Sequence, residues 1–140
     1  MAMKCSRREV WFWIPALMAS RGLAAEASIP SKVVRFEDLP VESGDGHALR
    51  RILKGKTHTG YAIEMHETDL APGAMPHPPH HHAHEEVFFI REGSLEVTLA
   101  GRASRLGPGS VVYVASNEEH GLRNVGSTHA QYFVIALGTE

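Results

Sequence analysis

Five histidines lie between His77 and His84, and Glu86 follows them. Imidazole nitrogens and carboxylate oxygens together are typical ligands of divalent transition metals. Three prolines within or just before this run keep the chain extended, and alternate side chains of an extended chain share one face. We therefore expect His80, His82 and Glu86 to point the same way. Burying such groups without partners is costly, and a metal ion would remove that cost.

A further ligand is expected from a distant part of the chain, and His120 is the best candidate. It follows the apolar run Val111–Val114 and a polar turn at 115–119. A second interpretation stays open at this point, because histidine clusters on exposed loops are often only solvated and bind metal adventitiously. The glutamate in the same segment and the distant histidine favour a built site.

The other histidines are expected to play smaller parts. His81 should point away from the site if the strand is regular, since its side chain has the opposite parity. His84 falls at a bend, on the surface or behind the ligands, and His77 is placed at the mouth of the site. No role is assigned to the remaining four, His47, His58, His66 and His129.

The elements that position these residues read as strands. After Pro30, short β-branched and aromatic runs alternate with Gly, Pro, Asn and Asp, and no helical period is found. The expected strands are 32–37, 49–53, 61–69, 87–90, 95–99, 111–114 and 130–137. Runs 87–90 and 95–99 should form a hairpin around residues 92–94, with the first buried on both faces. Many short strands without room for crossover helices predict an all-β sandwich or barrel.

The histidine segment resembles the first motif of the single-domain cupins, which are small β-barrels whose two motifs surround a metal. That motif runs Gly, five residues, His-x-His, three or four residues, Glu, six residues, Gly. The stretch from His80 and His82 through Glu86 to Gly93 fits it, whereas Gly73 stands one place too early.

The second cupin motif runs Gly, five residues, Pro-x-Gly, two residues, His, three residues, Asn. Gly109, His120 and Asn124 fit it, while Ala115 replaces the Pro and Asn117 replaces the second Gly. Asparagine is the best non-glycine choice for a left-handed turn position, so we expect the turn to survive. The resemblance covers residues 69–137, about half of the chain.

The resemblance implies a single cupin barrel, jelly-roll-like (a double-stranded β-helix), over residues 28–140. The implied ligands are His80, His82, Glu86 and His120, around one divalent ion of Mn, Fe, Co, Ni, Cu or Zn. The implied function is a metal-dependent enzyme of dioxygenase, isomerase or decarboxylase type on a small oxygenated organic molecule. The alternative is non-catalytic binding of a small molecule or of the metal. Cupins commonly pair through outer strands, so a homodimer is expected, with 32–37 as the edge to inspect.

Composition excludes several other classes. The chain has 140 residues, enough for one ordinary domain, with 14 basic and 16 acidic residues and a net charge of −2. No long basic block suggests a nucleic-acid surface, and no apolar run of about 18 residues suggests a membrane span. A single cysteine, Cys5, rules out a disulfide framework and a thiolate zinc cluster.

Residues 1–27 have the layout of a secretory signal: basic residues, then an apolar stretch at 10–19, then small residues. Ser6-Arg7-Arg8 resembles a twin-arginine signal. We expect cleavage after Ala25 or Ala27 and export to the periplasm, which would remove both tryptophans and leave tyrosine fluorescence alone. Two alternatives remain: an amphipathic helix packed on the domain, or translation from Met18, which would give a cytoplasmic protein.

Overall fold

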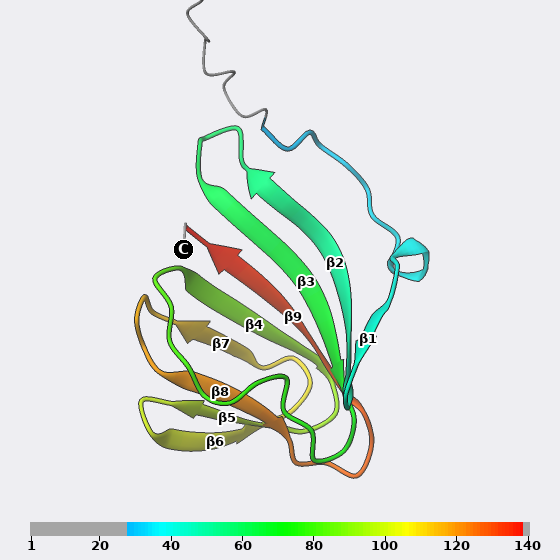
Figure 1. Ribbon diagram of the computed structural model, residues 1–140, viewed down its shortest axis with the longest axis vertical. Helices are drawn as coiled ribbons and strands as arrows, with labels where there is room; N and C mark the ends of the chain where they lie inside the picture. The colour runs from blue at the N-terminus through cyan, green and yellow to red at the C-terminus, as the bar shows by residue number, and fades with distance from the viewer. Residues whose placement is uncertain (1–27, 139–140) are drawn as a thin grey trace, which may run out of the picture.

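The computed structural model describes residues 28–138, so the export signal expected over residues 1–27 lies outside them. The described part of the chain contains nine strands and one short 3-10 turn, η1 (Phe36–Asp38) (Figure 1). The strands are β1 (Glu42–Gly44), β2 (His47–Lys56), β3 (Ala62–Leu70), β4 (Glu85–Glu92), β5 (Leu95–Leu99), β6 (Arg102–Leu106), β7 (Val111–Val114), β8 (His120–Asn124) and β9 (Ala130–Leu137). Among these residues no helix is long and apolar enough to cross a membrane.

Two antiparallel sheets enclose the core. The larger has the strand order β1-β2-β3-β9-β4-β7 and the smaller has the order β6-β5-β8. In Figure 1 the larger sheet curls over the smaller one, which lies below it. The all-β, jelly-roll-like prediction is confirmed, although the two sheets share no strand pair among the described residues and the barrel is not closed.

Strand β4 shows how alternation sorts side chains between the two faces. Glu86, Phe88 and Ile90 point inward, and Phe88 and Ile90 are among the most buried residues of the core. Phe89, with the opposite parity, is 45% exposed on the outer face. The shared face predicted for the even-numbered residues is confirmed, but the prediction that this strand is buried on both faces was wrong.

The expected hairpin between β4 and β5 does not form. β4 pairs with β7 and β9, whereas β5 pairs with β6 and β8 in the other sheet. Gly93 has a φ of 82°, and a Cβ there would lie 2.6 Å from the Cα of Ala130. The glycine therefore marks the point where the chain passes from one sheet to the other.

Residues 32–37 are not a strand, which corrects the prediction for that segment. Lys32 donates a side-chain hydrogen bond to the carbonyl of Ile52 on β2, so the segment lies beside that strand. The chain then forms the 3-10 turn, where the centre of the Phe36 ring lies 4.8 Å from the guanidinium carbon of Arg50 and 4.5 Å from that of Arg91. The homodimer expected at this edge stays a prediction.

The long connection between β3 and β4 brings the two motifs together. It runs along the free edge of β8, where Gly73 and Ala74 exchange backbone hydrogen bonds with Asn124, and His80 pairs with His120. Asn117, in the turn before β8, has a φ of 63°, as expected for a residue in place of glycine. Its amide donates to the carbonyl of His82, which ties the turn to the connection.

Candidate metal centre

Three of the four side chains predicted as ligands, His80, His82 and His120, lie together between the sheets, and Glu86 contacts two of them. His80 and His82 come from the connection, Glu86 from the start of β4 and His120 from the start of β8. The ligand nitrogens of the three histidines lie within 4.8 Å of one another. The Glu86 Oε2 atom lies 3.3 Å from His82 Nε2 and 3.2 Å from His120 Nε2.

Backbone carbonyls fix the protonation pattern of two of these rings. His82 Nδ1 lies 2.8 Å from the carbonyl oxygen of His84, and His120 Nδ1 lies 3.0 Å from that of Glu118. A carbonyl only accepts, so each Nδ1 carries the hydrogen and each neutral ring keeps a lone pair on Nε2. Metal-binding histidines are commonly oriented by such a bond from the nitrogen that does not bind the ion.

Two buried nitrogen atoms of the site have no hydrogen-bond partner, which suits the binding of a cation. His82 Nε2 and His80 Nδ1 are buried and have no hydrogen-bond partner. His82 Nε2 nevertheless lies 3.3 Å from a carboxylate oxygen. Two electron-rich atoms at that distance repel each other unless a proton or a metal ion lies between them. The donor set of three imidazoles and one carboxylate therefore fits a divalent transition metal.

The surroundings of His80 keep its imidazole in the neutral form that can bind a metal ion. Burial lowers the pKa of His80 to about 4, and the neighbouring His77, His120 and His82 act in the same direction. His80 is therefore neutral at neutral pH, the state in which imidazole binds a metal. His120 is 1% exposed, so its ring is also held away from solvent.

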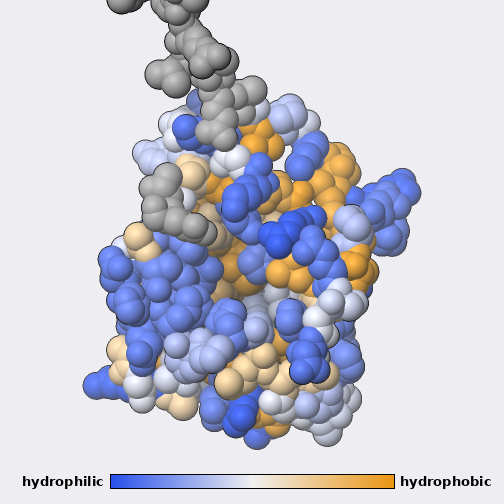
Figure 2. Space-filling view, viewed as in Figure 1, coloured by the Kyte–Doolittle hydropathy of each residue, from blue (hydrophilic) through white to orange (hydrophobic). Residues whose placement is uncertain are grey.

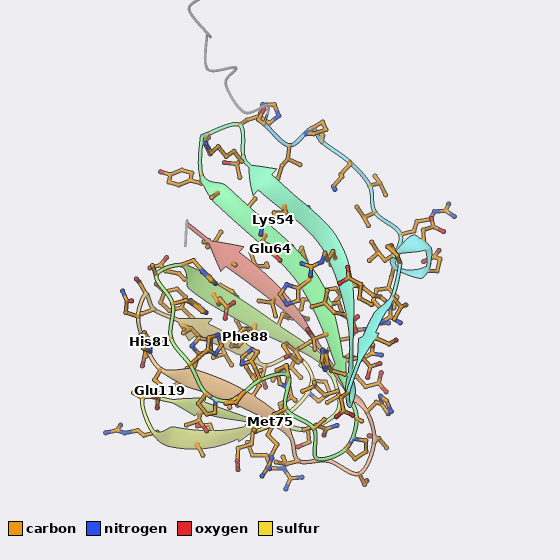
Figure 3. The ribbon with its side chains drawn as sticks, viewed as in Figure 1. Lys54, Glu64, Met75, His81, Phe88 and Glu119 are labelled. Atoms are coloured by element: carbon orange, nitrogen blue, oxygen red, sulfur yellow. The ribbon has the colours of Figure 1, made fainter. Side chains whose placement is uncertain are left out.

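A cavity of about 260 Å³ opens beside two of the four candidate ligands, Glu86 and His120, which form part of its wall. Its apolar lining includes Leu49, Phe88 and Leu122, contributed by both sheets. In Figure 3, Phe88 lies at the centre of the molecule between the sheets. On the face seen in Figure 2, apolar surface lies in the central part among polar groups.

Sequence reasoning gave His66 no role, yet its side chain lines the cavity. Its Nδ1 atom is buried without a hydrogen-bond partner, and burial lowers its pKa. Alternation along β3 could have indicated this position, because His66 and Thr68 are two residues apart and both face inward.

Tyr132 lines the same cavity, and burial raises the pKa of its hydroxyl, which stays protonated. His77 also lines the cavity, in agreement with its expected place at the mouth.

His81 and His84, the remaining histidines of the cluster, differ in their surroundings. His81 is exposed and points away from the site, as predicted (Figure 3). His84 contacts two of the candidate ligands: its ring stacks on His82 with centroids 3.6 Å apart, and its Nε2 lies 3.4 Å from Glu86 Oε1.

The asparagine of the second motif has a structural role. Asn124 is fully buried, and its side-chain amide donates to the carbonyls of Leu70 and Thr128. Its side-chain oxygen accepts from the amide of Gly126. It therefore ties β8 to the end of β3 and to the turn before β9.

A family model described as the cupin domain matches residues 66–136, the region that holds all four ligand candidates. The L-ectoine synthase of Bordetella parapertussis is 36% identical to this chain over 74 residues, which are 52% of this chain and 55% of that enzyme. An uncharacterised protein of Methanocaldococcus jannaschii is 24% identical over 88 residues, 63% of this chain and 70% of that protein. The chain thus spans about half the length of the ectoine synthases that it matches.

Solved structures give the same fold. An RmlC-like cupin from Shewanella frigidimarina superposes with a TM-score of 0.66 at 20% identity, covering 79% of this chain and 94% of that one. The polyketide cyclase RemF from Streptomyces resistomycificus superposes with a TM-score of 0.67 at 22% identity, covering 79% and 81%. With two antiparallel sheets, both motifs at one point and a family match over half of its length, this chain belongs to the cupin family.

Proposed function

We propose that this cupin holds one divalent transition-metal ion with His80, His82, Glu86 and His120, and that it is an enzyme acting on a small oxygenated organic molecule. The observation that carries the proposal is that the Nε2 atoms of His82 and His120 both lie within 3.3 Å of one carboxylate oxygen of Glu86, beside a cavity. A bound ion would supply Lewis-acid or redox chemistry to a carbonyl, carboxylate or hydroxyl oxygen.

The cavity supports a small substrate with few charges. Its volume of about 260 Å³ lies just below the usual range for pockets that hold drug-sized ligands. Among the described residues that line it, none is Lys or Arg, so a polyanionic ligand would lack cationic partners. Apolar walls exclude water, and the hydroxyl groups of Thr68 and Tyr132 offer hydrogen bonds to ligand oxygens.

His66 supports an enzymatic reading over simple binding. Its imidazole stands in the cavity wall, burial lowers its pKa, and its Nδ1 atom makes no hydrogen bond, although Glu64 Oε1 lies 3.8 Å away. Such a group suits the transfer of a proton to or from a bound molecule. The similarity to an enzyme, L-ectoine synthase, over about half of its length points in the same direction. The alternative is a cupin that holds a small molecule without turnover.

The first experiment is metal content per chain, measured by mass spectrometry on protein purified without chelators or a histidine tag. We expect about one ion per chain in the wild type and its loss in His82→Ala and His120→Ala, because each variant removes a ligand. The matched control is His81→Ala, which removes an exposed neighbour and should keep the ion. Metal that persists without His120 would instead indicate a loose chelator on the connection.

The identity of the ion then selects the assay. A redox-active ion calls for measurement of substrate-dependent oxygen uptake, and a redox-inactive ion for tests of isomerisation or decarboxylation of small hydroxy- and keto-acids. Turnover that disappears in His120→Ala supports the enzyme. Tight ligand binding without turnover supports the alternative.

A further inference from the structure

The two oxygens of Glu86 have different neighbours. Oε2 lies 3.3 Å from His82 Nε2 and 3.2 Å from His120 Nε2, and so belongs to the proposed centre. Oε1 lies 3.4 Å from His84 Nε2. Since a carboxylate only accepts hydrogen bonds, His84 must carry its hydrogen on Nε2 and donate it to Oε1.

His84 is itself held in place by the ligand before it. Its ring is parallel to that of His82, with an interplanar angle of 6° and centroids 3.6 Å apart. Its backbone carbonyl accepts the hydrogen bond from His82 Nδ1 at 2.8 Å. Its side chain is only 14% exposed. Residue 84 thus contacts two ligands, one through its carbonyl and ring and the other through Nε2.

We propose that His84 is a positioning residue that keeps Glu86 a one-oxygen ligand, an inference that rests on the metal centre proposed above. With Oε1 engaged by His84, only Oε2 is free to bind the ion. Three imidazoles and one carboxylate oxygen then leave two positions on a six-coordinate ion for exogenous donors. If both oxygens bound, one position would remain, too few for a substrate to bind through two oxygens.

A competing arrangement makes His84 a ligand in its own right. Ligand atoms of His82, His84 and Glu86 also lie within 4.8 Å of one another, close enough to hold one ion. The two arrangements make opposite predictions for the number of water molecules on a bound ion. Loss of a positioning His84 frees Oε1 to bind and displaces a water, whereas loss of a ligand opens a position to water.

Water-proton relaxation with Mn(II) distinguishes them, because relaxivity scales with the number of water molecules bound to the ion. In His84→Phe, which keeps a ring beside His82 but has no donor, we expect relaxivity to fall by about half and Mn(II) affinity by about tenfold or more. In His84→Gln, which keeps an N–H donor, both should stay near the wild-type values. His81→Phe, at the exposed neighbour, is the matched control.

The remaining outcomes overturn the inference. A higher relaxivity in both His84→Phe and His84→Gln would show that His84 is a ligand. An unchanged relaxivity in loaded His84→Phe would show that His84 does not control the carboxylate. Failure of the wild type to take up any ion would defeat the proposed centre as well, and so differs from both.

The hydrogen bond has a second test that needs no ion. Long-range ¹H–¹⁵N spectra of the metal-free protein report which ring nitrogen carries the hydrogen. We expect His84 as the Nε2–H tautomer, and His82 and His120 as Nδ1–H tautomers. An Nδ1–H tautomer for neutral His84 would contradict the proposal whatever the metal content.

Discussion

His80 and His120 exchange two backbone hydrogen bonds, 3.0 Å and 2.9 Å long, each amide donating to the carbonyl of the other residue. One residue belongs to the connection between β3 and β4, and the other begins β8. The separation of their rings, with centroids 4.6 Å apart, is therefore set by main-chain pairing. Backbone pairing of this kind would arrange these candidate ligands before an ion binds, which would lower the ordering cost of binding.

Gly121→Ala should loosen this arrangement. A Cβ at Gly121 would lie 3.1 Å from Pro79 Cγ, so the connection next to His80 must shift by a few tenths of an ångström. We expect metal affinity to fall by about tenfold, with a loss of about 1 kcal/mol in unfolding free energy. Competition with a chromophoric chelator measures the affinity. Gly107→Ala is the control, since a Cβ there meets nothing within 4 Å, and equal affinities for the two variants would count against the idea.

Asn124→Ala should destabilise the fold without touching a ligand. It removes the three hydrogen bonds from the buried amide and leaves the carbonyl of Leu70 without its side-chain donor. A loss of about 3 kcal/mol is expected in urea unfolding. Asn117→Gly is the contrasting variant: its φ of 63° suits glycine, and within residues 28–138 its side chain bonds only to Ser116, so stability should hardly change.

The ion pair of Arg50 and Glu67 should matter more than that of Arg51 and Glu42. Arg50 Nη1 lies 2.8 Å from Glu67 Oε2, and the Glu67 side chain is 0% exposed. Arg50→Ala therefore leaves a buried carboxylate without its partner. We expect that variant to lose about 3 kcal/mol of unfolding free energy. Arg51 and Glu42 are 58% and 56% exposed, and Arg51→Ala should cost less than about 1 kcal/mol. Parallel urea titrations compare them, and similar losses would refute the distinction.

Acid should weaken the metal-free protein in part through His66. Burial lowers the pKa of His66 below its usual value of 6.5, although the nearby Glu64 carboxylate opposes the shift. As pH falls through 6.5, the unfolded chain takes up this proton before the folded chain does. Protonation therefore favours unfolding, and stability falls between 6.5 and the lower folded pKa, with no effect above that window.

His66→Gln removes this contribution. The difference in unfolding free energy between about pH 7.5 and about pH 5.5 should be smaller in the variant than in the wild type, both with a chelator present. An equal or larger difference in His66→Gln would show that this imidazole is not the group responsible.

The strands that sequence predicted well are short segments rich in apolar, β-branched or aromatic residues and separated by turn residues. The bounds expected for β5, β7 and β9 match the structure. β8 was missed because Gly121, Arg123 and Asn124 give it no alternating apolar pattern. The turn around Gly93 has the composition of a hairpin, but whether a chain folds back or crosses to another sheet depends on partners far away in sequence.

Three of the four candidate ligands could be predicted because they are local, whereas His120 was predicted from its place after the run Val111–Val114 and from the second cupin motif. His80, His82 and Glu86 follow one another in a short segment, so their spacing is visible in the sequence. His66 reaches the cavity only through the register of β3 against β9, where it lies opposite Val134. Alternation along β3 could place His66 on the same face as Thr68, but only the structure shows that this face lines the cavity.

Glu86 belongs to the six-stranded sheet and His120 to the three-stranded sheet, two layers without a shared strand pair among the described residues (Figure 1). An ion held by both would act as a cross-link between the layers. Since such an ion binds only the folded chain, a free concentration one hundred times its Kd would add about 2.7 kcal/mol to the unfolding free energy. Resistance to proteolysis would then follow metal supply, so that the lifetime of the protein would report how much of the ion its surroundings provide.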